Sequence, residues 1–115
     1  MKKIEVQGLA IRIKPFHEKD YISLTDIAAK AEGDSKQLIL RWMQNADTLL
    51  FLQAWEELHN PDFKVMQMNN FRLKHLEKRY SATPQKYIEQ TNAIGIVSKS
   101  GRYGGTYAHK EIALN

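Results

Sequence analysis

The chain has 115 residues, of which 43% are hydrophobic and 26% charged, a composition typical of a folded globular domain rather than a disordered segment. The absence of cysteine excludes disulfides, thiolate metal sites and a cysteine nucleophile. No stretch approaches the ~20 apolar residues of a membrane span, and the lysines after Met1 are not followed by the apolar run of a signal peptide. We expect one domain over residues 1–115, with no membrane association.

The formal net charge of +4 is unevenly distributed. Residues 1–63 hold 8 Lys/Arg and 10 Asp/Glu, a net charge of −2, whereas residues 64–115 hold 9 Lys/Arg and 3 Asp/Glu, a net charge of +6. A basic half on a nearly neutral chain predicts a polyanionic partner. A solvated basic surface is the alternative interpretation.

The N-terminal segment predicts a small β-unit. Residues 4–6 and 9–13 alternate apolar and polar side chains, the period of a half-buried strand, and residues 7–8 can form the turn of a hairpin. Residues 21–23 predict a third short strand. Residues 15–20, which include a proline, are expected to form a loop.

Helix signals follow. Ser23 or Thr25 can cap a short helix over residues 26–31, which Gly33 ends, and Asp34 can cap the next helix. One face of that second helix is apolar and comprises Leu38, Ile39 and Trp42.

Asp47 or Thr48 can cap a third helix, which Pro61 ends. Its apolar stripe comprises Leu49, Phe51, Leu52, Trp55 and Leu58. Residues 63–80 have no clear period, and we expect an irregular segment with room for one helix.

The C-terminal third has clearer signals. Thr83 followed by Pro84 is a helix start, with Tyr87, Ile88 and Thr91 expected to face inward. Residues 96–97 predict a buried strand and residues 106–107 its return strand, with a last helix beginning near His109. The chain stops soon after, which suggests that residues 1–115 are part of a longer protein.

These elements predict an α+β fold: an N-terminal β-hairpin unit, a helical middle and a C-terminal basic β-hairpin. Two short consecutive helices followed by a basic hairpin are also typical of a winged helix-turn-helix.

The basic hairpin is Gly-rich. Its glycines let the backbone approach another molecule closely, and its cations, hydroxyls and tyrosines can contact phosphate oxygens. The candidate residues are Lys99, Ser100, Gly101, Arg102, Tyr103, Gly104, Gly105, Thr106 and Lys110, with Tyr107 able to stack or donate a hydrogen bond. The glycine spacing matches neither a P-loop nor a dinucleotide fingerprint. A plain tight hairpin whose charges face water is the alternative.

The second helix offers another candidate surface. Opposite its apolar face lie side chains that can read base edges or hold phosphates: Ser35, Lys36, Gln37, Arg41, Gln44 and Asn45. An ordinary solvent-exposed face is the alternative. A basic run from Arg72 to Arg79 can add backbone contacts, although a solvated face suffices to explain it.

Enzyme chemistry has little support. The four histidines are scattered without a metal-binding pair, no serine lies in a nucleophile elbow, and few carboxylates lie after residue 63. We therefore expect no enzyme and no cofactor or metal.

The chain resembles the KilA-N domain of phages, large DNA viruses and bacterial mobile elements. The resemblance lies in residues 21–28, 42–45, 48–56 and, above all, in Gly95-Ile96 followed by residues 98–113. It implies a DNA-binding module similar in core fold to the fungal APSES domain, with residues 99–107 as a wing and residues 35–44 as a recognition helix. Only Lys36 and Arg41 supply positive charge on that helix. It is therefore less basic than a typical recognition helix, and the resemblance supports DNA binding by the wing more strongly than major-groove reading.

The resemblance implies double-stranded DNA as the partner and a regulatory protein of a phage or mobile element, acting in transcription in the cytoplasm. An RNA-binding or protein-interaction module with a basic docking face is the alternative function.

Overall fold

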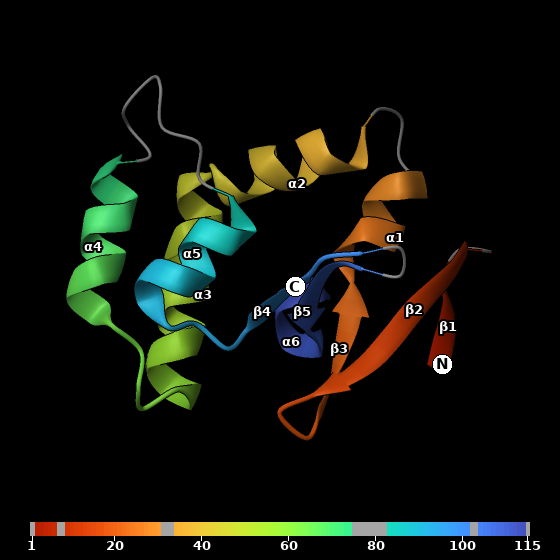
Figure 1. Cartoon of the computed structure of the whole chain (residues 1–115), viewed down its shortest axis with the longest axis horizontal. Coiled ribbons are helices and arrows are strands. Elements are labelled where there is room, and N and C mark those ends of the chain that lie inside the picture. The colour runs from red at the N-terminus through yellow and green to blue at the C-terminus, as the bar shows by residue number, and fades with distance from the viewer. Residues whose placement is uncertain (1, 7–8, 31–33, 75–82, 102–103, 115) are drawn as a thin grey trace.

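The computed structural model describes residues 2–6, 9–30, 34–74, 83–101 and 104–114. They form an α+β fold with helices packed around an antiparallel sheet (Figure 1). The strands are β1 (Lys2–Val6), β2 (Leu9–Phe16), β3 (Lys19–Ser23), β4 (Ile96–Lys99) and β5 (Gly105–His109). The helices are α1 (Leu24–Lys30), α2 (Ser35–Met43), α3 (Ala46–His59), α4 (Val65–Lys74), α5 (Pro84–Thr91) and α6 (Lys110–Ala113).

The five described strands form one sheet in the order β1-β2-β3-β5-β4, with every neighbouring pair antiparallel. The N-terminal β-unit and the C-terminal hairpin, which the sequence predicts as two elements, are thus parts of one sheet. The two units join where Tyr21 pairs with His109 and Ser23 with Tyr107. Local alternation cannot reveal this pairing, because it connects segments more than 80 residues apart.

The loop predicted for residues 15–20 is also wrong. β2 continues to Phe16, β3 begins at Lys19, and a two-residue turn joins them. His17 and Glu18 have φ angles of 51° and 63°, the backbone of the tight turns that match strand twist. Pro15 is tolerated because the pairing with β1 ends at Ile13, so that no strand needs its missing N–H on that side.

The helix starts follow the local signals. Ser23, which precedes α1, accepts a hydrogen bond from the Asp26 amide through its Oγ. Asp34 caps α2, and Thr83 caps α5, which has Pro84 in its first turn. The cap of α3 is Asn45, whose side chain accepts from the amides of residues 47 and 48, and not Asp47 or Thr48 as predicted. Gly33 and the predicted end of α1 at residue 31 lie outside the described residues.

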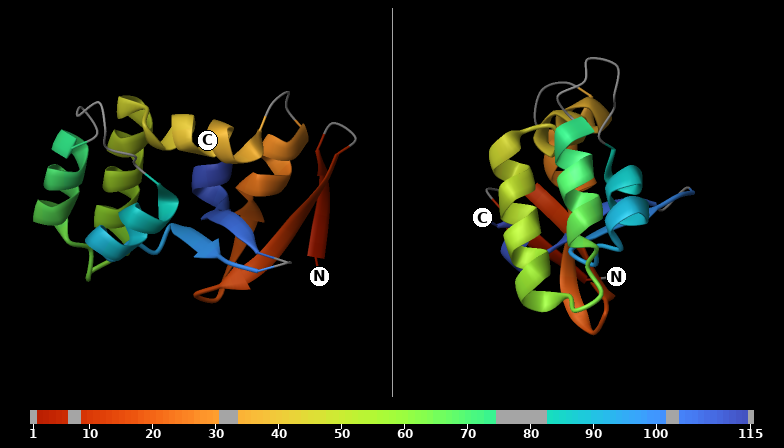
Figure 2. Two further views of the ribbon diagram at one scale, coloured as in Figure 1. Left: turned by 45° about the horizontal axis from the view of Figure 1, so that its top comes forward. Right: turned by 90° about the vertical axis from the view of Figure 1, so that its left-hand side faces the viewer.

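The main core lies between the helices and one edge of the sheet. Its most buried side chains are Met43, Leu49, Leu52, Met68, Phe71 and Tyr87. The prediction for Leu58 is wrong: it is 80% exposed, because the stripe that faces the core ends at Trp55. The irregular segment predicted after residue 63 contains α4, which packs beside α3 (Figure 2). Residues 75–82 lie outside the described part of the chain.

Candidate nucleic-acid interface

The Gly-rich segment forms a hairpin of β4 and β5, which we call the wing (residues 96–109). Val97 pairs with Tyr107 and Lys99 with Gly105. The wing projects beyond the neighbouring elements, as the right-hand view of Figure 2 shows. Lys99, Ser100 and Gly101 are exposed at its tip. Arg102 and Tyr103, which the sequence also predicts as DNA-binding residues, lie outside the described residues.

Two of the wing glycines have roles within the fold. A Cβ on Gly104 would collide with the carbonyl oxygen of Lys99, the residue before the turn. Gly105, with a φ of +146°, lies against α1, where an added Cβ would be 2.9 Å from Thr25 Oγ1. Gly101 has a φ of +98°, and no atom of the described residues lies within 4 Å of a Cβ added to it. Of these three glycines, Gly101 is the one whose position leaves room for another molecule.

The wing is attached to α1 at its return strand. The Thr106 amide donates to Thr25 Oγ1 at 2.9 Å, and the Gly104 amide donates to the Gly101 carbonyl at 3.1 Å. The hydroxyl of Thr25 thus ties the return strand of the wing to α1, while the tip stays exposed.

Lys110 does not lie beside Lys99. It begins α6, at the opposite end of β5 from Gly105, the strand partner of Lys99. Five residue steps of extended chain lead from Gly105 to Lys110, a span of about 16 Å. Lys110 is exposed, but it does not lie at the wing tip with Lys99.

Tyr107 cannot stack on a base as the sequence suggested, because its side chain is fully buried. Its ring lies 5.5 Å from that of Phe16. Among the described residues its hydroxyl has no hydrogen-bond partner.

The polar face predicted for the second helix is exposed on α2. Gln37 and Arg41 are one turn apart, and Gln44 continues the stripe just beyond the helix. Lys36 is also exposed, whereas Ser35 is half-buried and Asn45 is used as the cap of α3. α2 thus offers amide and guanidinium groups to solvent.

The opposite face of α2 borders an apolar cavity of about 330 Å³. Side chains of α1, α2 and α6 line it: Leu24, Ile27, Ala28, Leu38, Ile39, Trp42, Ile112 and Ala113. The predicted apolar face of Leu38, Ile39 and Trp42 is therefore confirmed, and it orients the polar stripe outward.

An ion pair holds α1 against β2. Asp26 accepts from the Arg12 side chain at 2.9 Å through each carboxylate oxygen and from the Arg12 backbone amide at 2.8 Å. Burial raises the pKa of Asp26, but the hydrogen bonds from Arg12 outweigh it and lower that pKa overall. The same side-chain hydrogen bond raises the pKa of Arg12. Arg12 is thus occupied in positioning α1.

Sequence reasoning missed the role of Glu56. Its carboxylate is completely buried and accepts from the amides of Ile94 and Gly95, the latter at 2.7 Å, and from Asn60 Nδ2 at 3.0 Å. It holds the segment that leads into the wing. The sequence signal that could have indicated a buried carboxylate is the position of this acidic residue next to Trp55, on the apolar side of α3.

His109 closes the base of the wing. Its Nδ1 accepts from the Glu111 amide at 3.1 Å and caps α6, and its ring contacts those of Tyr21 and Trp55. Burial lowers the pKa of His109, since it disfavours the imidazolium. Among the described residues, no three acidic or histidine side chains gather as metal ligands.

Arg72 and Lys74, the described residues of the basic run, lie on α4, on the far side of α3 from the wing (Figure 1). Arg72 donates to Gln53 Oε1 at 3.0 Å and so ties α4 to α3, while Lys74 is exposed. Residues 75–79 of the run lie outside the described part of the chain.

None of the helices that the structure describes is long and apolar enough to cross a membrane.

No match was found among curated proteins or among solved structures. The model of the KilA-N domain family, a family associated with DNA binding, matches residues 4–115. Because the match covers nearly the whole chain, including both strands of the wing, the protein belongs to the KilA-N domain family.

Proposed function

We propose that this domain binds double-stranded DNA through its wing and through the exposed face of α2. The observation that carries the proposal is the projecting wing, whose tip exposes Lys99, the Ser100 hydroxyl and the open backbone of Gly101. Cations, hydroxyls and backbone amides are the groups that hold DNA phosphates. Arg102, Tyr103 and Thr106 belong to the same proposed surface, the first two on the strength of the sequence.

In this proposal α1 and α2 act as a helix-turn-helix. Gln37 and Arg41 contact base edges, and Lys36 with Ser35 contacts the backbone. Glutamine and arginine side chains form bidentate hydrogen bonds in the major groove. The packing of α1 against α2 and the outward direction of the polar stripe support this role.

The family association also supports a regulatory role on DNA, in a phage- or mobile-element-derived protein, rather than an enzymatic one. Burial of Tyr107 favours duplex DNA over single-stranded RNA, since RNA readers stack bases on exposed aromatic side chains.

Fluorescence anisotropy with a labelled duplex, titrated at several salt concentrations, tests the proposal. Each neutralised phosphate contributes about −0.9 to the slope of log affinity against log salt. We expect steep salt dependence for the native chain and a shallower slope for K99Q and R102Q, by about 0.9 for each phosphate contact removed.

Lys64 provides a matched control, because it is exposed in the connection between α3 and α4, at the other end of the molecule from the wing. K64Q changes the net charge as much as K99Q and should leave the slope unchanged. Failure of the native chain to bind duplex at low salt would contradict the proposal. Competition by single-stranded RNA that exceeds competition by duplex DNA would favour the RNA-binding alternative.

A further inference from the structure

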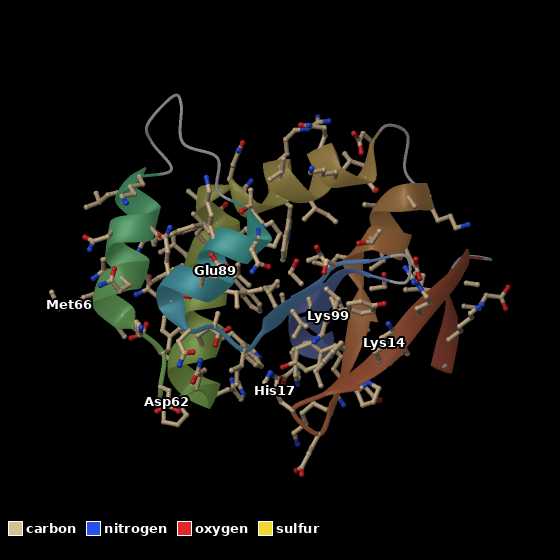
Figure 3. All side chains as sticks on the ribbon, in the orientation of Figure 1. Lys14, His17, Asp62, Met66, Glu89 and Lys99 are labelled. Carbon is tan, nitrogen blue, oxygen red and sulfur yellow. The ribbon has the colours of Figure 1, made fainter. Side chains whose placement is uncertain are left out.

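Two lysines from distant strands converge over one face of the sheet. Lys14 lies on β2 and Lys99 on β4, with β3 and β5 between those strands. Lys14 Nζ lies 5.2 Å from the ring centroid of Tyr107, and Lys99 Nζ lies 5.5 Å from that of Phe16. Each side chain therefore reaches across the sheet to an aromatic ring: Lys14 crosses β3 to reach β5, and Lys99 crosses β5 and β3 to reach β2 (Figure 3 labels both lysines).

The rings beneath these lysines form a continuous layer. Phe16 lies 5.5 Å from both Tyr21 and Tyr107, measured between ring centroids. The electron-rich faces of the rings attract the two ammonium groups and offset part of their mutual repulsion. We call the surface of Lys14, Phe16 and Lys99, which lies over the buried ring of Tyr107, the lysine–aromatic patch.

The charge around the patch is positive. Strand register places Lys19 opposite Phe16 on the same face, where it is exposed. Among the described strand residues, alternation puts one acidic side chain on this face, Glu5 on the outer strand β1. Asp26 of α1 also reaches this face, where its carboxylate is paired with Arg12. The patch thus suits an anion.

The patch offers charge and not stacking surface. Tyr21 and Tyr107 are buried, and the lysines lie over the rings of Phe16 and Tyr107. A base cannot stack where an aliphatic chain and an ammonium group already cover the ring, whereas a phosphate can bind the ammonium groups. Because Lys99 also belongs to the wing tip, the patch is continuous with the proposed DNA surface.

We propose that the lysine–aromatic patch is a second phosphate-binding site, which holds the backbone of the duplex that the wing engages. The inference rests on the proposed function and extends it to Lys14, on a strand outside the wing and outside α2. The role of the rings is to hold two like charges in a fixed arrangement before DNA arrives.

The test is the salt dependence of duplex binding by the full chain carrying K14Q. We expect a slope shallower by about 0.9, equivalent to a roughly threefold smaller loss of affinity between 50 and 200 mM salt. K14R, which keeps the charge and the contact with Tyr107, should bind as the native chain does. K64Q should leave the slope unchanged. If K14Q lowers the melting temperature, K14M preserves the aliphatic packing and takes its place.

A lysine acetylation footprint on the native chain supplies a measurement without any substitution. Saturating duplex should slow acetylation of Lys14 and leave Lys64 unaffected. The second site would be overturned if K14Q and K64Q gave equal slopes of log affinity against log salt, or if duplex left the acetylation of Lys14 unchanged. A reduced slope in K99Q would in that case still support the proposed function. Absence of all duplex binding by the native chain would overturn both.

Discussion

The wing and the segment that leads into it, residues 93–95, are both glycine-containing turns of the chain, yet they are held in opposite ways. The Gly95 amide donates to Glu56, and the Gly95 carbonyl accepts from the His109 amide. The Ile94 amide also donates to Glu56, and its carbonyl accepts from the Tyr21 hydroxyl at 2.6 Å. At the wing tip, by contrast, none of the described residues has an atom within 4 Å of a Cβ added to Gly101.

This contrast shows two uses of glycine in one short stretch. An added Cβ on Gly95 would lie 2.6 Å from Ile112 Cδ1 and 2.9 Å from Trp55 Cζ3, so glycine there permits close packing. Gly101 instead keeps backbone accessible to solvent or to a partner. The rigid segment provides a fixed base from which the exposed wing projects.

The largest effect should follow from E56A. This change removes the buried acceptor of the Ile94 and Gly95 amides and of the Asn60 side chain. Each buried donor left unpaired costs about 1–3 kcal/mol, and we expect a total loss of about 4 kcal/mol in the free energy of unfolding, measured by urea denaturation. E57A, at the exposed neighbouring position on α3, should change stability by less than about 0.5 kcal/mol. Equal effects of the two changes would show that the buried carboxylate is not what holds residues 93–95.

A smaller effect is expected at the attachment of the wing to α1. T25V keeps the shape of the side chain but removes the acceptor of the Thr106 amide, so we expect a loss of about 1 kcal/mol and weaker duplex binding. T25S retains the hydroxyl and should retain most of the stability and affinity. If T25V binds duplex with native affinity, the angle of the wing does not depend on this hydrogen bond.

The smallest effect concerns pH. The pKa of His109 is lower in the folded chain than its ordinary value of 6.5. As the pH falls below 6.5, the unfolded chain therefore binds a proton at His109 more readily than the folded chain does. The neutral imidazole therefore contributes stability above pH 6.5 that is lost on acidification. H109N keeps a side-chain acceptor for the cap of α6 and should reduce this loss, by less than about 1 kcal/mol, in thermal melts between pH 7 and 5.

Local signals predicted much of the secondary structure. Thr83 with Pro84, Asp34 and Ser23 each act within three residues of their own position, so they can be identified without knowing the fold. The extended β2 and its turn at His17-Glu18 were missed, because a non-glycine turn with positive φ has no strong local signal and Pro15 suggested a loop.

The candidate site could be predicted only in part. Glycine, lysine and serine in one stretch identified the wing, and the apolar spacing of α2 identified its exposed stripe. The separation of Lys110 from Lys99, the burial of Tyr107 and the internal roles of Gly104 and Gly105 could not be predicted. Each depends on what lies opposite a residue in the sheet, which sequence alternation does not specify.

The sequence by itself determined the basic C-terminal half, the starts of α1, α2 and α5, the Gly-rich hairpin and the resemblance to the KilA-N domain that the family match over residues 4–115 supports. Tertiary structure decided that β3 pairs with β5, that Glu56 lies beneath residues 94–95, and that Lys14 lies over Tyr107 and Lys99 over Phe16. The physical reason is the distance along the sequence between the residues that interact. Caps and turns are satisfied by neighbouring residues, whereas the hydrogen bond from Tyr21 to Ile94 spans 73 positions and forms only when the whole sheet is assembled.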